Sequence, residues 1–270
     1  MDFILYGTDA RLKYLAQKLK NAGHRVRFWR EAPEGFDALS SLLELSLPVR
    51  LVLPPRGSSA LAKEALETLP VGSRIFGGRL GDTEELSALC ARRAITWVDL
   101  DRDDAYCCEN AIPTAEGALH ALLPRTPKVL CKTHAALLGS GRVAEAVAEL
   151  FVRLGVRVTV IARNSEKRKA FESRGVCTLP LPLTEEAHEA LMSADALVNT
   201  VEVRGIVNET LLSLLPRGVP VLELASGREN VDLAAAEQRG HEVCFLPALP
   251  GKIAPASAAD ALFSAITKEG

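Results

Sequence analysis

A glycine-rich turn within residues 136–145 constrains the fold more than any other stretch of this chain. The stretch reads Ala136-Leu137-Leu138-Gly139-Ser140-Gly141-Arg142-Val143-Ala144-Glu145. Between a strand and a helix, Gly139 permits a sharp reversal, Gly141 leaves room for a pyrophosphate against bare backbone, and Ala144 lets the helix pack closely on the strand. Amides at the helix N-terminus then face the anion. The stretch therefore predicts a dinucleotide-binding turn.

The residues on either side of the turn complete a β-α-β unit. An apolar run precedes it at residues 135–138, and apolar residues then recur at helical spacing as far as Leu154. Gly155 is a helix stop signal, and the β-rich run at residues 156–162 predicts the next strand. This order is typical of a Rossmann domain. The alternative is a Rossmann-like domain that holds no ligand.

The tip of that second strand indicates which dinucleotide is bound. An NAD enzyme usually places an acid there to hold the ribose 2′-hydroxyl, and this chain has Arg163, Ser165 and Arg168 instead. Two arginines and a hydroxyl suit a 2′-phosphate, so we expect NADP. The predicted cofactor-binding residues are Gly139, Ser140, Gly141, Arg142, Val143, Arg163, Asn164, Ser165, Arg168, Asn199, Thr200 and Val201.

Composition and charge indicate which classes of partner, location and metal site this chain is not expected to have. The chain has 270 residues, 48% of them hydrophobic and 24% charged, with a formal net charge of -2, which gives no reason to expect nucleic acid or a membrane surface as partner. The N-terminus lacks a signal-peptide pattern and no apolar run reaches a membrane span, so we expect a cytoplasmic protein. The six cysteines show no Cys-x-x-Cys and no histidine at zinc spacing, so no metal site is expected.

Strand and helix patterns alternate along the whole chain and predict an α/β fold. We expect two doubly wound parallel-sheet domains, the second being the Rossmann dinucleotide-binding domain. The acidic run at residues 99–104 is interpreted as the end of the first sheet, a solvated linker and a helix-start signal. Pro113 is placed in the first turn of the helix that follows. The expected divisions are an N-terminal substrate domain at 1–109, a connector helix at 110–127, the NADP domain at 128–252, and a C-terminal helix at 253–270 that returns to the first domain.

Four segments, taken in order, carry a family resemblance. They are Gly7-Thr8-Asp9-Ala10-Arg11, Asn110-Ala111-Ile112-Pro113-Thr114-Ala115-Glu116-Gly117, Leu138-Gly139-Ser140-Gly141-Arg142 and Leu249-Pro250-Gly251-Lys252-Ile253-Ala254-Pro255. Together they resemble the family of dipicolinate synthase A subunits over nearly the whole chain. The chain departs from that pattern at Ala248 and Ala259, at Ser257, at Val201-Glu202 and at Cys107-Cys108-Glu109.

The resemblance implies an enzyme of spore-forming bacteria. It would oxidise dihydrodipicolinate to dipicolinate (pyridine-2,6-dicarboxylate) with NADP during sporulation, in the cytoplasm of the mother cell. A flavoprotein-like B subunit is the implied partner, and a homo-oligomer is compatible with the same reading.

A dicarboxylate substrate needs cationic and hydrogen-bonding partners. Arg11 and Lys252 are the predicted cations, and Lys252 is expected in an apolar loop between two prolines. Glu116 is the predicted general base, with Lys252 counted beside it as catalytic. The predicted substrate-binding residues are Asp9, Arg11, Ser58, Ser59, Asn110, Thr114, Pro250 and Gly251. Each has a plainer reading: Arg11 as an ion pair with Asp9, Glu116 as compensation of the helix dipole, and Asn110 as a helix N-cap.

Two other functions fit part of the pattern. One is another two-domain NADP-dependent dehydrogenase, similar to the shikimate or 2-hydroxyacid dehydrogenases, although their catalytic residue sets are missing. The other is an NADP-binding subunit that regulates a partner without catalysing a reaction.

Overall fold

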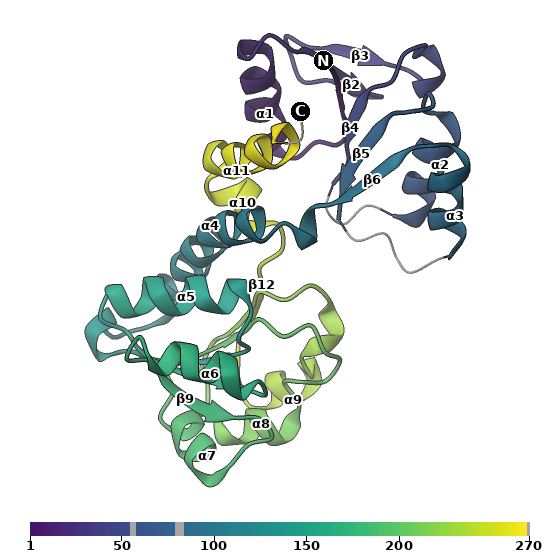
Figure 1. Ribbon diagram of the computed structural model, residues 1–270. Helices are drawn as coiled ribbons and strands as arrows, with labels where there is room; N and C mark the ends of the chain where they lie inside the picture. The colour runs from purple at the N-terminus through teal and green to yellow at the C-terminus, as the bar shows by residue number, and fades with distance from the viewer. Residues whose placement is uncertain (55–57, 79–83, 269–270) are drawn as a thin grey trace. The chain divides into compact units, whose positions relative to one another are not determined.

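The computed structural model describes residues 1–54, 58–78 and 84–268 of the chain. It contains two compact units, Met1–Asn110 with Ala254–Gly270 and Ala111–Ile253. Each unit is built on a six-stranded parallel sheet with helices on both faces (Figure 1). The predicted α/β class, with two doubly wound parallel sheets, is confirmed. None of the described helices is long and apolar enough to cross a membrane.

The first sheet has the strand order β3-β2-β1-β4-β5-β6. The order reverses between β1 and β4, and such a switch point is where doubly wound sheets bind ligands. The strands are β1 (Asp2–Leu5), β2 (Arg25–Trp29), β3 (Asp37–Leu39), β4 (Arg50–Val52), β5 (Arg74–Gly77) and β6 (Thr96–Asp99).

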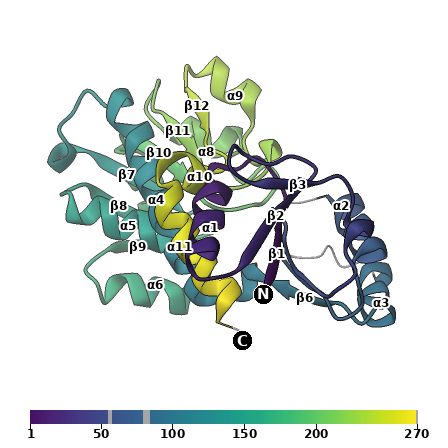
Figure 2. The ribbon, with the colours of Figure 1, turned by 90° about the horizontal axis from the view of Figure 1, so that it is seen from above.

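Alternate residues of the strands pack into two hydrophobic cores, one on each face of this sheet. Phe3 and Leu5 face α1 (Ala10–Asn21) and α11 (Pro255–Thr267), whereas Ile4 faces α2 (Ser59–Thr68) and α3 (Glu84–Arg92). Figures 1 and 2 both show α1 and α11 side by side on one face and α2 and α3 on the other. Lys18 of α1 pairs with Asp260 of α11, so the last helix is held to the first by charge as well as by apolar packing.

The second sheet has the order β12-β11-β10-β7-β8-β9, with its switch point between β7 and β10. One face of this sheet is covered by α5 (Arg142–Arg153), α6 (Ser165–Glu172) and the later part of α4 (Asp104–Leu122). The other face is covered by α7 (Glu185–Met192), α8 (Glu209–Leu214) and α9 (Leu233–Gln238). The strands are β7 (His134–Leu138), β8 (Arg157–Ala162), β9 (Cys177–Pro180), β10 (Ala196–Asn199), β11 (Val221–Glu223) and β12 (Val243–Phe245).

The start of helix α4 corrects a prediction. The helix begins at Asp104, not at Asn110, and Pro113 lies in its interior. Asp103 accepts a hydrogen bond from the Tyr106 backbone at 3.0 Å, which satisfies an amide of the first turn. The acidic run at residues 99–104 ends the sheet and starts a helix, as expected, but it is not an irregular linker, because it contains the end of β6, a 3₁₀ turn (Leu100–Arg102) and the first residue of α4. Burial of Ala111, Ala115 and Ala118 sustains the helix past the proline.

Two further elements differ from expectation. Lys252 was expected in a loop and lies in a short helix, α10 (Leu249–Ile253). The edge strand β3 was not expected, because only three residues form it and only Leu39 among them is buried. Helix α10 packs on α4 at Gly117, where an added Cβ would lie 2.6 Å from a methyl group of Leu249.

Candidate functional site

The turn after β7 requires glycine at its first position. Gly139 has a φ of 111°, in the region that favours glycine, and a Cβ built there would lie 2.2 Å from the Thr200 hydroxyl oxygen. Its amide donates to the Ile161 carbonyl at 3.0 Å, which ties the turn to β8. Gly139 is thus wedged between the ends of β8 and β10, the strands on either side of β7.

Gly141 is required for a different reason. Its backbone is extended, with φ −88° and ψ −179°, and a Cβ built there would meet no protein atom within 4 Å. It is the N-cap of α5 and supplies no capping side chain, whereas Asp9, Asn164 and Asn208 cap α1, α6 and α8. The first amides of α5 therefore lie beside open space, which is how a helix binds a phosphate group.

The two predicted arginines at the tip of β8 differ in how their side chains are bonded. Arg163 is exposed, and its side chain makes no hydrogen bond or ion pair with another described residue. Arg168 donates through one nitrogen to the carbonyls of Ala162 and Arg163, at 2.7 and 3.0 Å, so part of its guanidinium serves the backbone. Asn164 caps α6 by accepting from the Lys167 amide at 2.9 Å. Ser165 begins that helix and is exposed.

Residues 199–201 form the neighbouring wall of the turn. The buried Asn199 accepts from the Val201 amide at 3.0 Å and donates to the Val201 carbonyl at 3.1 Å, which closes a tight local loop. The Thr200 hydroxyl donates to the Leu138 carbonyl at 2.7 Å. These two side chains are engaged within the protein, so they shape the turn and leave contact with a ligand to the backbone.

Glu223, the last residue of β11, is a site residue that was not predicted from the sequence. Its side chain is 1% exposed and accepts from the Asn199 amide through both oxygens, at 3.1 and 2.8 Å. Burial raises its pKa from an ordinary 4.5 to about 7, although hydrogen bonds from Asn199, Asn230 and the Ala225 backbone act in the opposite direction. A glutamate inside the apolar run Val221-Leu222-Glu223-Leu224 was the signal in the sequence.

In the first unit, Asp9 and Arg11 form a tight pair at the start of α1. Asp9 accepts from the Arg11 amide at 2.9 Å and from two guanidinium nitrogens, the shorter contact being 2.6 Å. Burial would raise the pKa of Asp9, but the hydrogen bonds and charge of Arg11 outweigh it and lower the pKa. Arg11 also donates to the Asn110 side chain at 3.3 Å. The structure thus brings three predicted substrate residues into one cluster.

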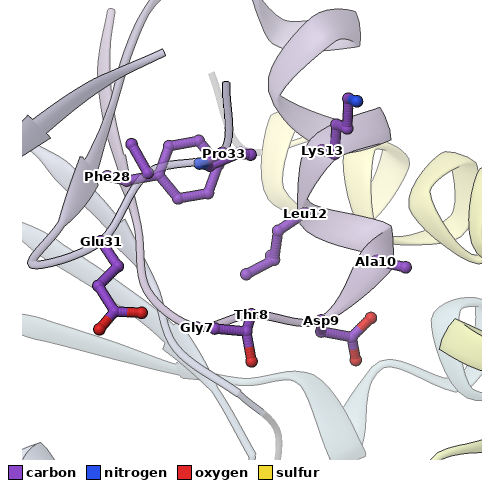
Figure 3. Close-up of a pocket in the computed structure, with 10 residues that line it drawn as sticks. Gly7, Thr8, Asp9, Ala10, Leu12, Lys13, Phe28, Glu31 and Pro33 are labelled. Atoms are coloured by element: carbon purple, nitrogen blue, oxygen red, sulfur yellow. The ribbon is translucent and has the colours of Figure 1, made fainter. Parts of the chain in front are cut away.

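Two cavities flank the chain at residues 7–9, beyond the carboxyl end of β1. One of about 290 Å³ is shown in Figure 3, where Leu12 of α1 and Phe28 of β2 project toward its middle and Gly7, Thr8 and Asp9 form its lower edge. The other, of about 590 Å³, shares these three residues and is bounded by Tyr6, Trp29, Arg30, Glu31 and Pro54. Both lie at the carboxyl-end edge of the sheet, where ligands of doubly wound folds bind.

The remaining predicted residues are distributed as follows. Ser58 caps α2 by accepting from the Leu61 amide at 3.2 Å, and Ser59 begins that helix, so the hydroxyl of Ser58 has a structural role. Thr114 is half-buried on α4. Glu116 and Lys252 are exposed on their helices, whereas Pro250 and Gly251 are buried. Ser140, Arg142 and Val143 are half-buried in and after the glycine turn.

The fold is shared with nicotinamide-dependent dehydrogenases. An L-alanine dehydrogenase structure superposes with a TM-score of 0.65 at 17% identity, covering 99% of this chain and 88% of that one. D-lactate dehydrogenase with NAD+ from Lactobacillus jensenii superposes with a TM-score of 0.61 at 14% identity, covering 100% and 95%. At these identities the comparison concerns the fold alone.

Dipicolinate synthase A subunits have higher sequence identity and higher TM-scores to this chain than these dehydrogenases. No protein-family model matches the chain. The crystal structure of the A subunit of dipicolinate synthase from Bacillus halodurans superposes with a TM-score of 0.82 at 25% identity, covering 99% of this chain and 96% of that one. The A subunit of dipicolinate synthase from Bacillus subtilis (strain 168) is 30% identical over 208 residues, which are 77% of this chain and 68% of the relative. The chain therefore belongs to the family of dipicolinate synthase A subunits.

Proposed function

We propose that this protein oxidises dihydrodipicolinate to dipicolinate and passes the hydride to NADP, as the A subunit of a dipicolinate synthase. Family membership supports the reaction, and the turn at Gly139 and Gly141 supports the dinucleotide. The observation that carries the proposal is the open space beside Gly141 at an uncapped helix start, because it matches the shape and charge of a pyrophosphate. We further propose that the partner is a B subunit, and that the location is the mother-cell cytoplasm.

The residues of the second unit suit NADP. Backbone amides at the start of α5 would hold the pyrophosphate, and the exposed Arg163 and Ser165 would hold the 2′-phosphate. When bound, NADP supplies the hydride acceptor. The chain itself then orients the substrate and excludes water, since loss of one hydride and one proton from the dihydro ring gives an aromatic product.

The residues of the first unit suit a carboxylate. Arg11 keeps guanidinium N–H groups beyond those bonded to Asp9 and Asn110, because its fork carries five donors. Gly7, Thr8 and Asp9 border both cavities, and the Thr8 hydroxyl is a hydrogen-bond donor among them. We propose that this edge binds one carboxylate of the substrate. In the second unit, we propose Lys252 as a cation for the substrate and Glu116 as the proton acceptor.

The proposed reaction predicts coupled product formation. Given a dihydrodipicolinate precursor made chemically or enzymatically, the protein with NADP should form NADPH and dipicolinate at equal rates, measured by absorbance and by chromatography. The assay is run with and without the B subunit. Turnover absent from both would reject the proposed reaction, and NADPH binding without turnover would favour the alternative of a non-catalytic NADP-binding subunit.

Cofactor preference is predicted to depend on Arg163. Replacing it with alanine removes a charged donor to the 2′-phosphate, worth about 1.5–3 kcal/mol, so NADP should bind about tenfold more weakly or worse. Binding of NAD, which lacks that phosphate, should change by less than about twofold. Calorimetric titration of both dinucleotides measures this. The matched control is Arg174→Ala, an exposed arginine just past the other end of α6. Equal losses for NADP and NAD would contradict the role given to Arg163.

A further inference from the structure

Glu223 lies on the half of the second sheet that faces the nicotinamide in a Rossmann domain. Such a domain consists of two mononucleotide-binding halves that meet at the switch point, here between β7 and β10. The β7-α5-β8 half holds the glycine turn and the basic tip at Arg163. The other half begins with β10 and β11, which end at Asn199 and Glu223. The two ends are joined side by side by hydrogen bonds between these side chains.

Every polar contact of the Glu223 carboxyl group is with a donor. Asn199 donates to both oxygens, and the Ala225 amide and the Asn230 side chain donate to one of them at 3.0 and 3.4 Å. The orientation of the Asn199 amide is fixed, because its oxygen accepts from the Val201 backbone. An ionised carboxylate, which only accepts, matches this arrangement, whereas a protonated one turns an acceptor into a donor facing another donor.

The contacts continue from Glu223 to the glycine turn. Asn199 holds both backbone groups of Val201, and Thr200 between them is bonded to the Leu138 carbonyl through its amide and its hydroxyl. A Cβ at Gly139 would meet Thr200 at 2.2 Å and Val201 at 3.1 Å, so these two residues form the wall against which the turn is packed. Hydrogen bonds thus connect the Glu223 carboxylate to Asn199, and Asn199 to the wall of the glycine turn.

No charged side chain in the described part of the chain pairs with Glu223. On the segment that carries Asn230, Arg228 stacks on the Phe245 ring and Glu229 pairs with Arg204. After β10, Glu202 is exposed. The groups that face the carboxyl from β10 and from residues 225–230 are therefore amides, and nothing but hydrogen bonds opposes the cost of burying its charge.

We propose that Glu223 is a positioning residue for the dinucleotide, which in its ionised form holds residues 199–201 against Gly139 and so keeps the cofactor turn in its binding geometry. This inference rests on the proposed dinucleotide site in the second unit and adds to it a group that controls affinity. Burial raises the pKa of Glu223 to about 7, so the ionised fraction rises from about one tenth at pH 6 to about nine tenths at pH 8. If the ionised form is the one that binds, apparent affinity follows that fraction.

The test is dinucleotide binding, measured with NADPH by fluorescence titration at pH 6 and pH 8. Glu223→Gln imitates the protonated carboxyl group, because it keeps one acceptor oxygen and replaces the other with a donor. If the protonated form binds about tenfold more weakly than the ionised form, the ratio of the Glu223→Gln Kd to the wild-type Kd should be about two at pH 6 and about nine at pH 8. Titration of the 2′-phosphate affects both proteins equally and cancels in the ratio. Glu229→Gln, an exposed residue on the same segment, should behave as wild type at both pH values.

A second variant tests the same role in the opposite way. Asn230→Ala removes one donor to the carboxylate, which should raise the pKa of Glu223 and move the midpoint of the binding curve to higher pH. A residue with a purely structural role would not move this midpoint. Thermal unfolding without ligand confirms that each variant is folded.

The outcomes separate this inference from the function on which it rests. A ratio for Glu223→Gln that stays within twofold of its pH 6 value at pH 8 would overturn the inference and leave the dinucleotide site standing. An unchanged midpoint in Asn230→Ala would also overturn it. If the wild-type protein binds no dinucleotide at either pH, both the inference and the proposed function are rejected.

Discussion

Gly141→Ala is expected to weaken dinucleotide binding by more than about tenfold in a protein that is still fully folded. An added methyl group meets no protein atom within 4 Å, and the backbone there is extended, so alanine fits the folded chain without strain. Alanine also restricts the unfolded chain, so stability should stay equal or rise slightly. The same methyl group projects where the pyrophosphate approaches α5, and we expect the Kd of NADPH to rise by more than about tenfold, or ~1.4 kcal/mol. Titration and thermal unfolding measure the two effects separately.

Gly139→Ala is the matched comparison, because it should damage binding and folding together. Its Cβ would overlap the Thr200 hydroxyl, which must move and lose its bond to the Leu138 carbonyl. The positive φ costs an alanine about 1–2 kcal/mol more. A lowered unfolding midpoint in Gly139→Ala, set beside an unchanged one in Gly141→Ala, is the expected pattern. A Gly141→Ala protein that binds NADPH as wild type does would refute the pyrophosphate site.

Asp9→Ala is expected to cause the largest loss of stability in the first unit. It leaves the Arg11 guanidinium, whose side chain is 10% exposed, without its carboxylate, and breaking such a pair costs about 3 kcal/mol. It also removes the cap of α1, worth about 1 kcal/mol. Asp9→Ser is the matched control, since serine keeps a capping oxygen and loses only the ion pair. Chemical unfolding should place Asp9→Ser between Asp9→Ala and wild type.

The same pair gives a pH dependence of defined sign. The pKa of Asp9 in the folded protein lies below its ordinary value of 3.8, so the pair stabilises the fold above about pH 4. As the pH falls through the lower folded value, the carboxylate takes up a proton and the stabilisation is lost. The difference in unfolding free energy between wild type and Asp9→Ser should therefore be present at pH 7 and should decrease as the pH falls below about 4. A difference that persists in acid would show that the ion pair is not its cause.

Much of the fold could be predicted because its signals are local and repeated. The apolar runs at residues 135–138 and 196–198 lie in strands whose residues are all buried, and parallel sheets, which are covered on both faces, produce such runs. The glycine turn was predicted with its β-α-β setting, since Gly139 and Gly141 have the two backbone requirements that the motif encodes. The Asp9 and Arg11 ion pair was one of two readings of those residues, and the structure shows that the pair forms.

The rest depended on contacts between residues far apart in sequence. Proline at position 113 suggested a helix start, yet burial of the alanines around it sustains one helix from Asp104. Glu223 looked like an ordinary charged residue, because its partners Asn199 and Asn230 are brought to it only by the packing of β10 and β11. Sequence spacing also placed Lys252 in a loop, although Pro250 and Gly251 beside it are buried in a short helix.

The return of α11 to the first unit has a consequence for how the protein is made. Ala259, Ala261, Leu262 and Ile266 belong to the core that also contains the apolar face of α1. During synthesis from the N-terminus, residues 111–253 emerge before these four, so the second unit has its complete sequence while the first unit still lacks one of its helices. A chain that stops before residue 254 would therefore leave the apolar face of α1 uncovered, and such a fragment is a substrate for chaperones and proteases.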